Sequence, residues 1–199
     1  MTANDEIDLK AQLNLIETMM AAGRRSTESW GWSFLLWGIA YYVATAWSTL
    51  GRSNWAWPVT MTAAIAVTAI IGARVSRGHP ETTLGRAIGG VWKVMGTSLG
   101  VVMLALSLSG HYDIHVYMAI IGAMLAVAHG TSSLILKWKM QFACALVWLG
   151  AGVAGCFGSD NQAGISFLVA IFFCQILFGI YAMTLDARRR RQRQGAVHA

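Results

Sequence analysis

The sequence predicts an all-α fold: an integral membrane bundle of six transmembrane helices in three antiparallel hairpins, preceded by an amphipathic cytoplasmic helix. Three observations predict it. Of the 199 residues, 56% are hydrophobic and only 12% are charged, about half the charge of an ordinary soluble domain. Six apolar runs are each long enough to cross a bilayer. Lys and Arg gather beside the ends of these runs on one side.

The chain divides into three parts in order. We expect residues 1–31 to form a cytoplasmic amphipathic helix and a linker, residues 32–186 the six-helix membrane domain, and residues 187–199 a basic cytoplasmic tail. No apolar segment of the kind found in a cleavable signal peptide precedes the first apolar run. We therefore expect the first span itself to direct insertion into a bacterial plasma (inner) membrane.

The first helix is predicted over residues 5–22 by an apolar stripe at helical spacing, formed by Leu9, Leu13, Ile16 and Met20. Its first turn is acidic, which the helix dipole favours. Because the polar face is acidic rather than rich in lysine, the helix is poorly suited to a membrane surface. It is expected to dock on protein, either this chain's own bundle or a cytoplasmic partner.

The six spans contain no Asp or Glu, and only the third contains a lysine, Lys93. They are predicted at residues 33–50, 56–73, 89–109, 116–136, 141–158 and 165–184. Short connections make consecutive helices antiparallel, which gives hairpins at 32–77, 89–138 and 141–186. Asp113 and Asn161 are positioned to cap the fourth and sixth spans, since short polar side chains accept hydrogen bonds from the first free N–H groups.

Orientation follows from the basic residues. With the N-terminus inside, fourteen of the fifteen Lys and Arg residues fall on the inner side and only Arg52 on the outer. The positive-inside rule therefore predicts that both termini are cytoplasmic and that the number of spans is even.

Small residues predict where helices pack closely. Three faces carry them: Gly96 with Gly100, then Gly150 with Ala154 and Gly158, and then Val147 with Ala151 and Gly155. Such faces bring membrane helices together. Two of the three lie on the fifth span, which predicts a central position for it. They either join neighbours within one chain or join two copies in a homodimer.

A layer of polar side chains is predicted about 10–14 Å from the cytoplasmic ends of five spans, counting 1.5 Å per residue. Its members are Tyr41, Tyr42, Thr97, Ser98, His129, Trp148 and Gln175. Polar groups at this depth are costly unless they face the bundle and find partners. The layer is either a structural network, with His129 paired to Gln175 or to Thr97 or Ser98, or a site for a solute or ion.

The tail carries a dense run of arginines directly after the last span. Basic residues beside an anionic leaflet contribute about 1 kcal/mol each, so the run is predicted to contact lipid rather than nucleic acid. The lipid-contacting residues are Arg188, Arg189, Arg190, Arg191 and Arg193.

Catalytic and cofactor signatures do not occur in the sequence, and we expect neither an enzyme nor a cofactor. A haem site would need two facing histidines, but only His129 lies in a span. The three cysteines lie inside spans and are expected to be packing residues. His111, Asp113 and His115 cluster in one outer loop and would suit zinc or copper, although a polar loop without metal is expected.

The segment LNLIETMMAAGRRS, followed by WGWSFLLWGIAYY, resembles a group of uncharacterised bacterial six-span inner-membrane proteins often encoded beside PadR-type transcriptional regulators. The resemblance covers about the first 45 residues and the overall layout. The three-hairpin plan is also similar to that of the acid-resistance membrane protein family HdeD. These resemblances imply membrane-stress or regulatory physiology and assign no site.

The sequence therefore predicts a non-enzymatic inner-membrane protein that acts by protein or lipid interaction. Its contacts would be the N-terminal helix and the basic tail, with an anionic inner leaflet and a cytoplasmic protein as partners. The alternative is a small-solute channel or carrier that uses the polar layer.

Overall fold

A computed structural model describes residues 3–76, 82–110 and 113–197, and within these ranges every regular element is a helix. The elements are α1 (Ala3–Ser29), α2 (Gly31–Leu50), α3 (Ala56–Ser76), α4 (Thr83–Leu108), α5 (Ile114–Leu136), α6 (Lys139–Phe157), α7 (Asp160–Ile171), the π-helix η1 (Phe172–Leu177) and α8 (Phe178–Val197). The last three follow one another without a break. The predicted all-α class is confirmed for this part of the chain.

Five of the helices in the described ranges are long and apolar enough to cross a membrane, and the last of them runs from Asp160 to Gln192. The predicted first span forms α2, which has no charged residue but falls outside this group. Its five Trp and Tyr residues lower its mean hydropathy. The chain thus has five to six long apolar helices, as a membrane-embedded protein has.

The core lies where α2, α5, α6 and the continuous α7–η1–α8 helix meet. Helices α5 and α6 pack most closely, because two glycines let the backbones touch: a Cβ added at Gly122 would lie 2.7 Å from the Cα of Gly152. By contrast, within the described ranges the backbone of α3 comes close to that of α2 alone, and the backbone of α4 to those of α5 and α1 alone. Single aromatic side chains reach further, since Trp57 of α3 contacts Phe167 and Trp92 of α4 contacts Phe34. Helices α3 and α4 therefore stand at the periphery, and most of their side chains face outward.

Of the predicted small-residue faces, one packs closely against a neighbouring helix and the others do not. Gly155 packs against the side chain of Met118, and Ala151 is buried, so that face of α6 joins α5 as predicted. Gly96, Gly100 and Gly150 have no atom within 4 Å of an added Cβ. The prediction that they form packing faces within the chain is therefore wrong, because α4 lies at the edge and Gly150 points away from α5.

Of the two predicted helix caps, one is confirmed. The Asp113 carboxylate accepts a hydrogen bond from the backbone N–H of His115 at 2.8 Å and caps α5. The cap of α7 is Ser159 rather than Asn161, which lies inside the helix. Ser159 and Gln162 form a capping box, in which each side chain satisfies the other residue's backbone N–H. The two reciprocal hydrogen bonds of this capping box stabilise the start of α7 more than the single bond that Asn161 could form.

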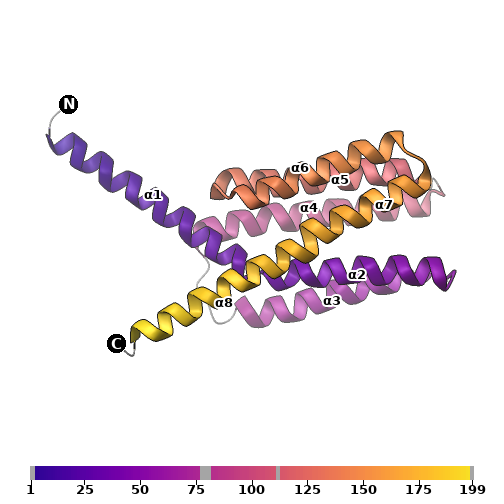
Figure 1. The fold of residues 1–199 in the computed structure, drawn as a ribbon, viewed down its shortest axis with the longest axis horizontal. Helices are drawn as coiled ribbons and strands as arrows, with labels where there is room; N and C mark the ends of the chain where they lie inside the picture. The colour runs from indigo at the N-terminus through magenta and orange to yellow at the C-terminus, as the bar shows by residue number, and fades with distance from the viewer. Residues whose placement is uncertain (1–2, 77–81, 111–112, 198–199) are drawn as a thin grey trace.

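Both ends of the chain lie at the same end of the molecule, hereafter the terminal end (Figure 1). Helix α1 extends to Ser29 and joins α2 through one turn at Trp30, so the predicted linker is very short. The predicted tail continues α8 as a helix. Figure 1 shows that α1 and α8 cross near the bundle and then diverge as two separate arms.

Candidate functional site

The buried polar side chain at the centre of the predicted layer is His129 on α5, which is completely buried. Aromatic rings surround it: its ring centroid lies 4.9 Å from that of Trp92, edge-on, and 5.8 and 5.9 Å from those of Phe34 and Phe178. These contacts come from α4, α2 and α8. His129 therefore sits in an aromatic enclosure formed by four helices.

His129 takes no part in the hydrogen bonding within this enclosure. The indole N–H of Trp92 donates to the hydroxyl of Ser132 at 3.2 Å. Neither ring nitrogen of His129 has a hydrogen-bond partner among the described residues. The predicted bonds from His129 to Gln175, Thr97 or Ser98 are therefore not formed.

The other members of the layer lie elsewhere. Tyr41 packs edge-on against Phe167, with ring centroids 5.6 Å apart, and Trp148 lies 6.2 Å from the same ring. The hydroxyl of Tyr42 donates to the backbone carbonyl of Leu168 at 2.8 Å, which ties α2 to α7. Thus Tyr41 and Trp148 belong to a second aromatic cluster around Phe167 of α7, separate from the rings around His129, and Tyr42 is bonded to the backbone of the same helix.

The remaining three predicted residues do not join either cluster. Thr97 and Ser98 are exposed on α4, because that helix presents only a narrow face to the bundle. Gln175 is buried, and its Cβ lies 3.0 Å from where a Cβ at Gly38 would stand. The structure therefore divides the predicted layer into two aromatic clusters, one glutamine and two exposed hydroxyls.

Sequence reasoning missed several buried polar residues, among them Gln141 near the start of α6. Its side chain is completely buried, and neither its amide nitrogen nor its amide oxygen has a partner among the described residues. A signal existed, since Gln141 stands at the first position of a predicted apolar span. The π-helix that carries Gln175 was also missed, although such segments often mark functional positions.

A second candidate site joins the roots of the two arms at the terminal end. Glu28 of α1 is only 2% exposed, and its Oε1 lies 3.1 Å from an Nη2 of Arg189 on α8, whose side chain is 40% exposed. The other carboxylate oxygen, Oε2, is buried without a hydrogen-bond partner. We call this contact the root ion pair.

Burial raises the pKa of Glu28 above its ordinary value of 4.5, against the opposing attraction of Arg189. Asp186 also raises this pKa, while Arg24 and Arg25 lower it. The net direction means that desolvation of the carboxylate outweighs the attraction of its partners. A charged Glu28 is thus costly to bury, and Arg189 is the group that offsets this cost most.

The root of α1 also packs through apolar contacts. A Cβ added at Gly23 would lie 2.7 Å from Leu136 and 2.8 Å from Leu84, so the helix backbone lies directly on α5 and α4. Thr27 is buried one turn later. Gly23 and Thr27 continue the helical stripe that begins at Leu9, so the inner half of this stripe docks on the chain's own bundle.

The outer half of the stripe, on residues 8–19 of α1, has no cover. We call this segment the α1 arm. Leu13 is 53% exposed and Ile16 is 52% exposed, and the other apolar side chains on the face are exposed to a similar degree. These other residues are Leu9, on the stripe, and Met19, at its edge. Leu15 is exposed as well but lies on another side of the helix. The apolar side chains of the arm are thus exposed, and Figure 1 shows this part of α1 extending beyond the bundle.

The arginine run of α8 is partly engaged in ion pairs. Arg188 and Arg191 are exposed, and Arg190 donates to the Asp186 carboxylate one turn earlier at 2.8 Å. Arg189 is the member of the predicted lipid-contact set that pairs with Glu28. The side chain of Arg193 lies outside the described residues.

At the opposite end, His115 ties three helices together. One ring nitrogen lies 2.6 Å from the carbonyl oxygen of Gly155 on α6, and the other lies 3.1 Å from the Asp160 carboxylate on α7. Of the predicted metal-site residues, His111 lies outside the described residues. Among those that are described, no group of three or more His, Cys, Asp or Glu side chains gathers as metal ligands do.

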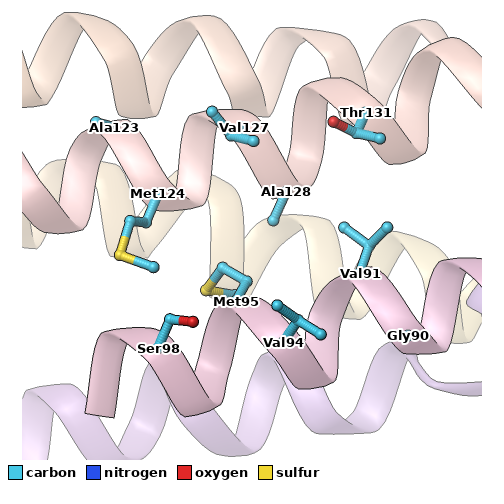
Figure 2. Close-up of a pocket in the computed structure, with 10 residues that line it drawn as sticks. All are labelled: Gly90, Val91, Val94, Met95, Ser98, Ala123, Met124, Val127, Ala128 and Thr131. Atoms are coloured by element: carbon cyan, nitrogen blue, oxygen red, sulfur yellow. The ribbon is translucent and has the colours of Figure 1, made fainter. Parts of the chain in front are cut away.

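A shallow groove runs between α4 and α5 with a volume of about 590 Å³. Figure 2 shows side chains of both helices lining it, with Met95 and Met124 facing each other. Ser98 and Thr131 supply its only hydroxyl groups. It lies on the outer surface of the bundle, and its apolar lining suits contact with lipid tails rather than with a polar solute.

Comparison of the chain with protein families, with characterised proteins and with solved structures found no match.

Proposed function

We propose that this chain is a non-enzymatic integral membrane protein, with both termini in the cytoplasm, that acts by binding a cytoplasmic protein through the α1 arm. The observation that carries the proposal is the continuous apolar stripe of α1, whose inner half is docked on the bundle while Leu13 and Ile16 stay exposed. Burial of such a face is strongly favourable, at about 25 cal/mol per Å². The arm therefore retains a large capacity to bind.

The chemistry of the arm favours a protein over a lipid surface. Its polar face carries Asp8 and Glu17 and only one basic residue, Lys10. An anionic leaflet would repel this face, whereas amphipathic helices that bind membranes usually have a basic polar face. The fitting partner is a protein with an apolar groove and a basic rim, as in other helix-in-groove complexes.

The root ion pair supports this role because it anchors the arm. With Glu28 tied to Arg189 and Gly23 packed on Leu84 and Leu136, the exposed part of α1 is held at a fixed direction to the bundle. Holding a binding helix in its bound conformation lowers the entropy lost on association. The exposed arginines of the run that do not pair with Glu28, Arg188 and Arg191, contribute a second contact, to the anionic inner leaflet.

The alternative of a small-solute carrier draws on the buried polar atoms of His129 and Gln141. It requires polar side chains from several helices to meet. Thr97 and Ser98 face outward, and His129 is enclosed by aromatic rings. The interaction role is therefore the better supported of the two.

The test is a variant with Leu13→Ser and Ile16→Ser, purified with its native membrane and compared with the wild type. Asn14→Ser is the matched control, since Asn14 lies on the same turns but on the opposite face. A cytoplasmic protein is expected to co-purify with the wild type and the control and to be lost, by at least about tenfold, from the double variant, because two buried apolar contacts contribute more than 1.4 kcal/mol.

The same preparations, reconstituted in liposomes, separate the two functions. Equal recovery of every bound protein by all three preparations, together with saturable solute flux, would reject the interaction role in favour of the carrier.

A further inference from the structure

Arg189 belongs both to the root ion pair and to the arginine run that is predicted to contact lipid. Arg189 is the second arginine of the run, one helical turn beyond Leu185, where the apolar part of α8 ends. This is the level at which lipid phosphates would meet the run. Yet its guanidinium is directed at Glu28, whose carboxylate is buried.

The carboxylate of Glu28 has no adequate substitute for Arg189. Its second oxygen is buried without a hydrogen-bond partner, and Asp186 stands close enough to repel it. Arg24 and Arg25 attract it only from a distance, since neither forms an ion pair with it among the described residues. A buried charge that loses its partner is strongly destabilised.

We propose that an anionic phosphate surface acts as a release switch for α1: recruitment of Arg189 to lipid phosphates leaves Glu28 unpaired and frees the root of the helix. Docking of α1 and binding of anionic lipid by the run then oppose each other, and the opposition is reciprocal. This inference concerns the regulation of the proposed docking helix and takes its physiological meaning from that function.

The released helix would differ from the docked one in a definite way. Freeing the root exposes the inner stripe at Gly23, which now faces Leu84 and Leu136, and at Thr27, which is now buried. The apolar face of α1 would then run without interruption from Leu9 to Thr27. Anionic lipid would therefore both free the arm from its fixed direction and lengthen the surface that a partner can bind.

The experiment measures the distance between the two arms in the full-length protein. Spin labels are placed at Thr18→Cys on α1 and Gln192→Cys on α8, both exposed, with the exposed Cys156 changed to serine. The protein is reconstituted in vesicles of neutral phosphatidylcholine, with or without anionic phosphatidylglycerol. In neutral vesicles the distance distribution is expected to be narrow. Phosphatidylglycerol is expected to raise the ratio of released to docked α1 by a factor of about five or more, the lower end of ordinary allosteric coupling.

Two variants make the test specific. Glu28→Gln keeps the shape of the side chain without its charge, so its distribution is expected to stay narrow in both lipids. Arg191→Gln removes an exposed arginine of the same run that does not touch Glu28, and it is expected to keep the response. A wild-type distribution that ignores phosphatidylglycerol, or one that broadens equally in Glu28→Gln, would overturn the proposal.

A further measurement distinguishes lipid phosphate from free inorganic phosphate. Inorganic phosphate added to the protein in neutral vesicles is expected to have little effect, since the run responds to a surface that engages several arginines at once. A full response to free phosphate would overturn the assignment to lipid. Because the readout needs no partner protein, a working switch with no co-purifying protein would reject the proposed function alone.

Discussion

His129 is held by ring packing rather than by hydrogen bonds. Three aromatic rings contact it, and both of its ring nitrogens lack partners among the described residues. Polar atoms buried in this way reduce stability, by roughly 1–3 kcal/mol for each group. The histidine therefore contributes to the fold through its shape more than through its polarity.

Changing His129 to leucine is expected to leave the stability of the protein unchanged or to raise it slightly. The substitution keeps a side chain of similar size within the ring enclosure and removes two unpaired polar atoms. Thermal unfolding of the purified protein in detergent measures the effect. Combined with Gln175→Ala, the two changes are expected to add, because no hydrogen bond joins the pair. Strong coupling between them would contradict this structure, and lost solute flux at unchanged stability would favour the carrier role.

At the scale of helices, the closest contact is that of α5 with α6. It is built from Gly122 and Gly152, where the absence of side chains lets the two backbones meet, and from Gly155, which makes room for the side chain of Met118. Dispersion contacts between close-packed helices are a main source of stability inside a bilayer, where the hydrophobic effect does not drive helices together. This pair lies across the boundary between two predicted hairpins, so the bundle is more than a row of hairpins.

Gly122→Ala is expected to destabilise the protein by about 1–3 kcal/mol, because the new methyl group would collide with the α6 backbone. Gly150→Ala is the matched control on α6, with open space around the added carbon. Its effect is expected to stay within about 0.5 kcal/mol. Denaturation of both variants in the same detergent compares them. Equal loss of stability in the two would show that the glycine contact does not form.

Helix α4, unlike α5 and α6, does not use its glycines at 96 and 100 for close packing within the chain. Only Ile88 and Leu99 are buried along its 26 residues, and the glycines at 96 and 100 face open space. Within the chain this face has no packing role. The expectation that such a face joins two copies of the chain stays a prediction.

At the scale of the whole molecule, both described ends of the chain lie at the same end of the molecule (Figure 1). This arrangement agrees with an even number of spans. It leads to a direct test of orientation in the membrane.

Single cysteines at Asn54 and Asn161, in a protein with Cys156 changed to serine, are expected to react with a membrane-impermeant maleimide in intact cells. Cysteines at Gln12 and Gln192, at the terminal end, are expected to react only after permeabilisation, because the positive-inside rule places that end in the cytoplasm. All four positions are exposed, so burial does not confuse the result. Reversed labelling would contradict the orientation.

The amino-acid sequence by itself determined the helical class and most of the helix ends. Apolar length sets where a helix can cross a bilayer, and local chemistry sets where it begins. Thus the run predicted at 116–136 forms α5 from Ile114 to Leu136, with Asp113 as its cap. Such features depend on residues close together in the chain, so the sequence contains them.

Only the tertiary structure decided which faces meet. Depth along a helix can be counted, but rotation about its axis depends on its neighbours, and so Thr97 and Ser98 face outward although their depth matches that of His129. The same is true of Glu28 and Arg189, which are far apart in the chain and whose contact exists because α1 crosses α8. Neither residue's own surroundings in the sequence show the other, and only folding brings the buried carboxylate and its arginine together.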